Sequence, residues 1–353
     1  MFNNFCTKVV FVMKKKSLIY LVILSLMITL VGCSKEKVTT KENYLLDTII
    51  QLKVYGKNSE KATNDAMNAI SNIDDIMSPT KSISDVVKIN HKAGKDFVNI
   101  NNDTLKVIKT SIDYSKISDG KFDITVGPLV KLWGIGTKNA RVPSKQEINN
   151  ALKLINYKDV LIDEKNKSVK LNSSNESIDL GGIAKGYAAD KAREVLENQG
   201  IKSAYLNLGG NIVAIGNKTD GTPWNIGIQD PLKNRGEYFG IIRVSNKSIV
   251  SSGSYERFFI KDNKKYHHIL NTKTGYPAES GILSSTIVSD KSIDGDALST
   301  ITFILGLEKS MEIIEKMDGV DAILVTNDKK VHVTSNIAKD FKLSSKEYIY
   351  EKR

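Results

Sequence analysis

The chain is poor in cysteine, proline and aromatic residues. Only two of its 353 residues are cysteine, Cys6 and Cys33, and both lie in the first tenth of the sequence. For the remaining chain this excludes an internal disulfide framework and cysteine-based metal or thiol chemistry. With 6 prolines and 24 glycines the chain is neither collagen-like nor low-complexity, and 41% hydrophobic residues are enough for a sizeable core.

No block of one charge sign dominates the sequence. Of the formal net charge of +11, four units come from lysines within residues 1–33, which leaves +7 for the rest of the chain. These charges are dispersed, and neither an RNP-like stretch nor a zinc-finger spacing is present. We therefore interpret the charge as a solvated surface and expect no nucleic-acid partner.

The N-terminal apolar run is too short to span a membrane. Leu18–Val31 supplies fourteen mostly apolar residues after three lysines, whereas a spanning helix needs about 20. The run ends in Leu30-Val31-Gly32-Cys33-Ser34, which resembles the lipobox of bacterial lipoproteins. Residues 1–33 are thus predicted to be a lipoprotein signal peptide. Its alternative is a plain signal peptide with an incidental cysteine, and Met13 suggests that residues 1–12 are an overextended start.

Acylation of Cys33 would hold the protein on the cell membrane, at its extracytoplasmic face. The polar residues 34–43 are predicted to form a flexible tether. Residues 44–345 are then the folded part, and we see no internal repeat or linker that would divide it.

Apolar spacing predicts an α+β fold with a mainly antiparallel sheet and packed helices. Helices are expected at 59–77, after Asn102 or Asp103, after the capping-box sequence Ser144-Lys145-Gln146-Glu147, from Gly182 to about 199, and at 294–305 and 307–317. Strands are expected at 48–55, 122–126, 160–162, 169–171, 178–180, 205–208, 212–215, 224–228, 240–244, 249–252, 257–260, 266–270 and 283–288, with a last hairpin over 322–333.

A glycine-rich turn leads into the helix near residue 184. The sequence Ile178-Asp179-Leu180-Gly181-Gly182-Ile183-Ala184-Lys185-Gly186-Tyr187 combines a predicted strand, paired glycines and an early helical lysine. Exposed N–H groups at a helix start favour anions, so a diphosphate would fit there. Neither the dinucleotide fingerprint nor the P-loop spacing is met. A tight structural turn and a phosphate site both remain open.

Asp294-Gly295-Asp296-Ala297-Leu298-Ser299-Thr300 heads a second helix. Asp296 and Thr300 are four residues apart and share a face, which presents a carboxylate and a hydroxyl together. Such oxygens suit Mg²⁺, which completes its shell with water and substrate phosphates. An N-capping aspartate with an ordinary helical threonine is the alternative.

Two further segments carry candidate site residues. In Tyr266-His267-His268-Ile269-Leu270, the adjacent histidines of a strand point to opposite faces, so one could be a general base and the other packed. The aromatic and glycine-rich stretch from Gly120 to Gly134 suits either a flat-ring pocket or a core strand.

Together these segments resemble the ApbE-type FAD:protein FMN transferases over about residues 44–340. The similar stretches are 122–134, 179–190, 206–210, 252–255, 268–275 and 296–306, with weaker matches at Met77-Ser78 and Ile89-Asn90. The resemblance implies a single ApbE-like (T-fold-like) domain. It also implies transfer of FMN from FAD to a threonine or serine hydroxyl of another protein, with Mg²⁺ on the pyrophosphate and release of AMP.

The resemblance also implies roles for individual residues. The metal ligands are expected to be the carbonyl of Ala184 and the side chains of Asp296 and Thr300, with Ser299 as a further ligand in some members. His268 is expected to be the general base. The positions expected to contact FAD are Leu46, Thr80, Lys121, Phe122, Asp123, Gly182, Lys185, Tyr187 and Ile269, of which Leu46 and Thr80 depart from the residue types usual in the family.

One loop departs from the family pattern. After His268 the family usually has Ile-Asp-Pro-x-Thr-Gly, whereas Asn271 and Thr272 stand here in place of the aspartate and proline. The family's acceptor motif, roughly Asp-Gly-x-Thr/Ser-Gly-Ala-Thr/Ser, does not occur in this chain. The expected partner is therefore another protein, such as an FMN-binding subunit of an Rnf-type or Nqr-type complex. Alternatives are hydrolysis of FAD to FMN and AMP, or flavin binding without catalysis.

Overall fold

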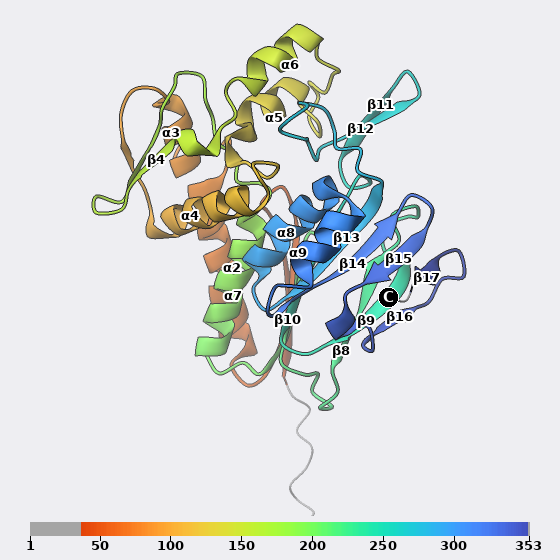
Figure 1. Cartoon of the computed structure of the whole chain (residues 1–353). Coiled ribbons are helices and arrows are strands. Elements are labelled where there is room, and N and C mark those ends of the chain that lie inside the picture. Colours follow the sequence, from red (N-terminus) through yellow and green to blue (C-terminus); the bar gives the residue numbers. More distant parts are fainter. Residues whose placement is uncertain (1–36, 352–353) are drawn as a thin grey trace, which may run out of the picture. The chain divides into compact units, whose positions relative to one another are not determined.

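The computed structural model describes residues 37–351, and a nine-stranded sheet runs through the centre of this part of the chain (Figure 1). Neighbouring strands pair antiparallel, except that the last two pair parallel. In spatial order the strands are β1 (Val38–Leu45), β2 (Thr48–Tyr55), β6 (Ser203–Leu208), β7 (Asn211–Ile215), β10 (Lys247–Gly253), β13 (Ile282–Ser289), β14 (Val320–Thr326), β15 (Lys330–Val333) and β17 (Ile349–Glu351).

Helices cover one face of this sheet. Apolar side chains of the helices and of the inner sheet face form one large buried cluster, which includes Leu52, Ile70 and Leu298. The covering helices are α2 (Ser59–Met77), α7 (Ala184–Asn198), α8 (Ser292–Leu305) and α9 (Leu307–Ile314). Helix α2 forms because its apolar residues recur every three or four positions and so lie on one face. Helix α7 ends shortly before Gly200, whose φ of +77° is incompatible with a right-handed helix.

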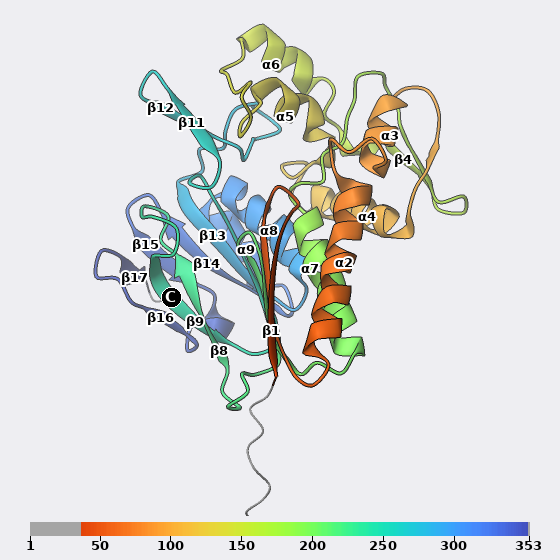
Figure 2. The same cartoon turned by 180° about the vertical axis from the view of Figure 1, so that it is seen from behind.

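A three-stranded sheet covers the opposite face, as Figure 2 shows from behind. It consists of β8 (Trp224–Gln229), β9 (Tyr238–Val244) and β16 (Phe341–Leu343). The fully buried Phe239 lies between the rings of Phe341 and Tyr348 in this second cluster. The confirmed fold is therefore one α+β domain with a mainly antiparallel sheet.

The remaining elements lie beyond the helices, at the end of the domain that carries the candidate site. They are α3 (Asp85–His91), α4 (Asn102–Ile117), α5 (Gly127–Trp133), α6 (Lys145–Leu152), β3 (Val98–Asn99), β4 (Val160–Asp163), β5 (Ser168–Leu171) and the hairpin β11 (Phe258–Lys261) and β12 (Lys264–His267), with single 3₁₀ turns at Ile124–Val126 and Tyr157–Asp159. A third 3₁₀ turn, Ser335–Ile337, precedes β16 and contributes Ile337 to the cluster on the opposite sheet face. Both hydrogen bonds of the predicted capping box, between Ser144 and Glu147, are present.

The predicted tether is wrong from Val38 onward. Residues 38–45 form β1, which pairs with β2 along its whole length, so the folded domain begins before residue 44. Because β1 is an edge strand held by backbone hydrogen bonds, its side chains are mostly exposed and its composition is polar. The predicted signal peptide, including Cys33, lies outside the described residues.

Two predicted strands next to the site are also wrong. The stretch 122–126 ends in a 3₁₀ turn capped by Asp123, and the Gly127-Pro128 pair begins α5 instead of stopping a strand, since proline suits the first turn of a helix. At 178–180 the backbone is held by a side chain: the Asn90 amide accepts from the Ile178 N–H at 2.7 Å and donates to its carbonyl at 3.0 Å.

No helix among residues 37–351 has both the length and the apolar character that crossing a bilayer requires.

Candidate active site

The first turns of α7 and α8 lie against each other and form the centre of the site. The Gly186 N–H donates to a carboxylate oxygen of Asp296 at 2.8 Å. A Cβ on Gly186 would lie 2.3 Å from the carbonyl oxygen of Ser292, so only glycine allows this approach. Asp190, one turn further along α7, accepts from the N–H groups of Ser292 and Ile293 at 2.7 and 2.9 Å. The two helix starts are thereby fixed to each other.

Asp296 and Thr300 both lie in α8, four residues apart and therefore on one face of the helix. Asp296 is only 4% exposed, and its second oxygen lies 3.5 Å from the Lys185 ammonium. The Thr300 hydroxyl makes no hydrogen bond to any residue within 37–351, so its oxygen is available to a ligand. A carboxylate, a free hydroxyl and a cation therefore meet in one place.

The glycine turn and the Phe122 segment reach the same place. A Cβ on Gly182 would lie 3.2 Å from the Phe122 ring and 3.9 Å from the Thr300 hydroxyl. Lys185 Nζ donates to the carbonyl of Gly181 at 3.2 Å, and Asp179 accepts from the Gly181 N–H at 2.7 Å. Burial raises the pKa of Asp179, which Lys185 counteracts. Three of the four predicted segments thus converge on Asp296.

The donor set fits Mg²⁺. Among residues 37–351 no three His, Cys, Asp or Glu side chains gather into a metal site, so a metal here would depend on one carboxylate, neutral oxygens and substrate phosphates. Mg²⁺ is commonly held in this way, whereas Zn²⁺ prefers nitrogen and sulfur ligands. Ser299 differs from Thr300, because its buried hydroxyl donates to the Asp296 carbonyl at 3.0 Å and contacts the Ser252 hydroxyl at 2.8 Å.

His268 directly follows β12 and is exposed. The backbone N–H of His268 donates to the carbonyl of Arg257 at 3.1 Å, and the ring nitrogen Nδ1 lies 3.2 Å from the same oxygen. Because a carbonyl can only accept, this contact favours the tautomer with hydrogen on Nδ1 and a free lone pair on Nε2. The surrounding protein desolvates the ring and lowers the pKa of His268 to about 4, and the charges of Arg257 and Lys185 contribute to the lowering. The ring is therefore a neutral acceptor at pH 7.

The neighbouring histidine has a packing role. His267 is 7% exposed, its Nε2 contacts the Ala278 carbonyl at 3.0 Å, and its ring meets Phe303 edge-on at 5.5 Å. Burial lowers its pKa. One histidine of the pair is thus packed, as predicted, and the general-base role of His268 stays a prediction.

Three adjacent predicted FAD positions lie on the turn before α5. Phe122 is 6% exposed and packs against the Gly182 backbone, while Lys121 is half-buried. The Asp123 carboxylate accepts from the N–H groups of Thr125 and Tyr157, at 2.8 and 2.9 Å. Asp123 therefore shapes the turn, and its contact with FAD stays a prediction.

The other predicted FAD positions are more dispersed. The Tyr187 ring is 3% exposed, with its hydroxyl donating to Asp103. Ile269 is buried, and Leu46 lies half-buried in the β1–β2 turn at a φ of +53°. Thr80 is exposed after α2, where its hydroxyl contacts Ser78 at 3.2 Å. Direct contact of these four residues with FAD stays a prediction.

The unusual loop after His268 keeps a tight turn. The Asn271 side-chain oxygen accepts from the Lys273 N–H at 2.9 Å, as an aspartate oxygen would. Thr272 donates its hydroxyl to the carbonyl of Gly120 at 2.6 Å and thereby joins the loop to the Phe122 segment. The Trp133 indole donates to the Gly275 carbonyl at 2.8 Å.

Sequence reasoning missed three residues that position the site. Asn90 holds the backbone before the glycine turn, and only its place in a weak motif pointed to it. Asp190 joins α7 to α8, and the Arg257 carbonyl orients His268. The sequence does not indicate the role of Arg257, because its backbone carbonyl is the acceptor and the register of the hairpin decides which carbonyl faces His268.

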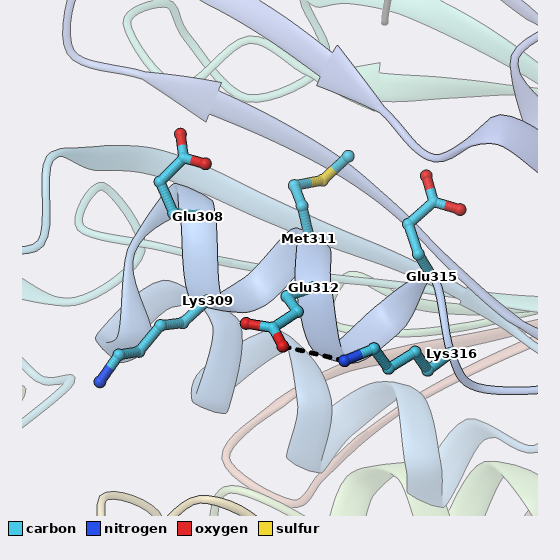
Figure 3. A pocket seen from close by; sticks show the side chains of 6 residues that line it. All are labelled: Glu308, Lys309, Met311, Glu312, Glu315 and Lys316. Carbon is cyan, nitrogen blue, oxygen red and sulfur yellow. Dashed lines mark hydrogen bonds and ion pairs between the residues drawn. The ribbon is translucent and has the colours of Figure 1, made fainter.

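Two surface hollows lie apart from these residues. One, of about 410 Å³, lies along α9 and is lined by Met311 and charged side chains, as Figure 3 shows. Glu312 and Lys316, four residues apart on the same segment, form an ion pair at 2.9 Å. The other, of about 360 Å³, lies beside β12, between Lys265 and Tyr276. Neither contains the Asp296 and Lys185 pair.

Comparison with known proteins places the chain in a family. The ApbE family model matches residues 46–324. A FAD:protein FMN transferase of Klebsiella pneumoniae is 34% identical over 302 residues, which cover 86% of this chain and 93% of the relative, and one of Treponema pallidum is 29% identical over 91% of this chain and 93% of the relative. The crystal structure of the ApbE protein of Thermotoga maritima superposes with a TM-score of 0.80 at 34% identity, covering 86% of this chain and 99% of that one. The chain therefore belongs to the ApbE family.

Proposed function

We propose that this protein transfers FMN from FAD to a threonine or serine hydroxyl of a target flavoprotein, with release of AMP and dependence on Mg²⁺. The observation that carries the proposal is the meeting of the free Thr300 hydroxyl, the Asp296 carboxylate and Lys185 at paired helix starts. A neutral histidine with a free Nε2 acts as the acceptor beside them. The similar proteins are named FAD:protein FMN transferases, and this set of groups suits the reaction in that name.

The residues divide the reaction among them. The acceptor hydroxyl oxygen attacks the phosphorus on the FMN side of the diphosphate, and the bond from that phosphorus to the bridging oxygen breaks, with its electron pair leaving on AMP. Nε2 of His268 takes the hydroxyl proton. Lys185 and the N–H groups of the glycine turn hold the phosphates.

Asp296, Thr300 and the carbonyl of Ala184 would hold the metal. Mg²⁺ bound there supplies charge that stabilises the transferring and leaving phosphates. Gly186 orients the Asp296 carboxylate through its N–H, and Asp190 fixes the helix that carries it. Phe122 closes one side of the site against Gly182.

The test is covalent flavin transfer to an acceptor domain by purified full-length protein with FAD and Mg²⁺. Asp296→Asn should lower the transfer rate by about a hundredfold or more, because the metal contributes several kcal/mol. Asp294→Asn is the matched control on the same turn, since Asp294 accepts from the Tyr114 hydroxyl at 2.8 Å. Equal rates for Asp296→Asn and the control would refute the assignment. Free FMN and AMP, or unchanged FAD, would instead indicate hydrolysis or flavin binding.

We also propose that acylated Cys33 holds the protein on the outer face of the cell membrane, beside an FMN-binding subunit of an Rnf-type or Nqr-type complex. The lipobox-like sequence before Cys33 supports this location. Cells fed an alkyne-tagged fatty acid should label the protein, whereas Cys33→Ser should remain unlabelled. Labelling of both proteins alike would refute Cys33 as the attachment site.

A further inference from the structure

Two hairpins meet beside His268, and Arg257 joins them. The Arg257 carbonyl contacts the His268 backbone and ring, while its guanidinium donates to the carbonyl of Asp47, in the β1–β2 turn, at 3.2 Å. Both hairpin ends therefore border the position where an attacking hydroxyl has to arrive. Figures 1 and 2 show the β11–β12 hairpin projecting away from the central sheet.

Each hairpin exposes large apolar side chains, on β1–β2 beside the turn and on β11 from its first residue toward the hairpin tip. Tyr44 and Ile49 are direct partners across the β1–β2 pair and are 67% and 55% exposed. Phe258 directly follows Arg257 and is 43% exposed, and Ile260, on the same face of its strand, is 66% exposed. Exposed apolar groups gathered next to a functional site are typical of an interaction surface.

The β11–β12 hairpin is built to present one face. Its other face is anchored, because Phe259 stacks on Tyr266 at 5.2 Å and Tyr266 packs on Trp133 at 5.5 Å. On the open face the Lys265 ammonium lies 4.2 Å from the Phe258 ring centre. The hairpin is therefore held at its root while Phe258 and Ile260 stay uncovered.

The charge on this surface is positive. Residues 256–267 carry four basic residues, Arg257, Lys261, Lys264 and Lys265, against Glu256 and Asp262. Glu256 is paired with Arg235 at 3.1 Å and Lys264 with Glu279 at 2.9 Å, which leaves Arg257, Lys261 and Lys265 against Asp262. A partner with acidic side chains around an apolar contact would complement this charge.

We propose that Tyr44, Ile49, Phe258 and Ile260, together with the hairpin lysines, form the docking surface for the acceptor protein. The proposal rests on the proposed function, which requires a protein hydroxyl to reach His268. Docking on these four residues, which we call the acceptor face, places a partner against the two hairpins that Arg257 joins at that histidine. The acceptor would present acidic residues near its reactive threonine or serine.

The experiment measures flavin transfer to the FMN-binding domain of an Nqr-type subunit that carries the sequence Asp-Gly-x-Thr-Gly-Ala-Thr. The variants are Tyr44→Ser/Ile49→Ser and Phe258→Ser/Ile260→Ser in the full-length protein. Their matched controls are Phe97→Ser and Ile349→Ser, whose side chains are 50% and 58% exposed on other segments. Each acceptor-face variant should raise the KM for the acceptor about tenfold or more, since buried aromatic and apolar anchors dominate interfaces.

Three further readouts distinguish lost docking from a damaged site or fold. The KM for FAD and the thermal melting temperature should match the controls, which shows that the site and the fold are intact. Lys261→Glu/Lys265→Glu should raise the acceptor KM and weaken its dependence on salt. Acceptor KM values equal to the controls would overturn the proposal.

A membrane role of the hairpin would also overturn it. In that case the Phe258→Ser/Ile260→Ser variant would lose binding to vesicles of anionic phospholipid and keep its acceptor KM. Absence of transfer by the unaltered protein would refute the proposed function itself, a result that the variants do not influence.

Discussion

At the residue scale, the state of His268 sets how the site handles a proton. Its ring is oriented by a backbone carbonyl where many hydrolases use a carboxylate. The hydrogen bond to this neutral carbonyl raises the pKa of the imidazole, but without a negative charge it does not offset the loss of water around the ring. Desolvation and nearby cations lower this pKa to about 4. The base is therefore weak but available across the neutral range.

This predicts an unusual pH profile. The kcat/KM for transfer should stay level from pH 8 to about pH 5 and fall only as the pH approaches about 4, where His268 becomes protonated. Steady-state rates measured across this pH range, in citrate and phosphate buffers whose ranges overlap, would show this acidic limb, that is, the fall of kcat/KM at low pH. His268→Gln should lose the limb and lower the rate about 10²–10⁴-fold. A limb centred near pH 6.5 would contradict the prediction.

The same shift affects stability, with a definite sign. The lowered pKa means that the unfolded chain, with a histidine pKa near 6.5, binds the proton more readily than the folded protein. The contribution of His268 to stability is thus fully present above pH 6.5 and is lost as the pH falls toward 4. Asp190 acts oppositely, because burial raises its pKa to about 6 and its contribution is lost as the pH rises through that value.

At the element scale, the α7–α8 contact determines whether Asp296 is in place. We predict that Gly186→Ala destabilises the protein by about 1–3 kcal/mol, because the new methyl group would overlap the Ser292 carbonyl. It should also abolish most transfer, since the Gly186 N–H orients Asp296. Urea unfolding and transfer assays would measure both effects.

The control for that variant is Glu194→Ala, at an exposed position of the same helix. It should change the free energy of unfolding by less than about 0.5 kcal/mol. If Gly186→Ala behaved like this control, the close approach of the two helices would be unimportant.

The loop after His268 is a second element with a testable design. Asn271→Asp should leave transfer nearly unchanged, since either side chain can accept from the Lys273 N–H. Asn271→Ala removes that acceptor and should cost about 0.5–1.5 kcal/mol of stability. Thermal melting of both variants beside the parent would distinguish them. Equal destabilisation by aspartate and alanine would show that the turn bond is unimportant.

At the scale of the whole molecule, the sheet separates the site from a structural core. Phe239 lies in the cluster on the sheet face opposite α7 and α8. We predict that Phe239→Ala lowers the free energy of unfolding by about 3–5 kcal/mol. The KM for FAD should be unchanged at temperatures where the variant is folded. A raised KM for FAD would indicate that the two faces are coupled.

The sequence predicted most elements but fewer of the contacts between them. The apolar residues of 59–77 recur at helical spacing, and the capping box at Ser144 marks a helix start. The structure confirms both predicted helices, as α2 and α6. The strand at 178–180 failed because Asn90, far away in sequence, takes the place of a neighbouring strand. Long-range side-chain pairing of this kind leaves no local pattern.

The candidate site shows the same division. The face shared by Asp296 and Thr300 follows from helix geometry, and the structure confirms the helix that contains both residues. That Gly186 and Lys185 reach Asp296 depends on how α7 packs on α8, which no local pattern specifies. The edge strand β1 was mistaken for a tether because backbone pairing needs no apolar side chains.

The start of β1 at Val38 has a consequence for reach. With Cys33 acylated as proposed, only the four residues 34–37 separate it from the first strand, and the five Cα–Cα steps from Cys33 to Val38 span at most about 18 Å. The start of β1 would then stay within that distance of the bilayer, while the β1–β2 turn beside Arg257 lies one strand length further along. The height of a target's threonine over the lipid surface therefore becomes a criterion for selecting substrates.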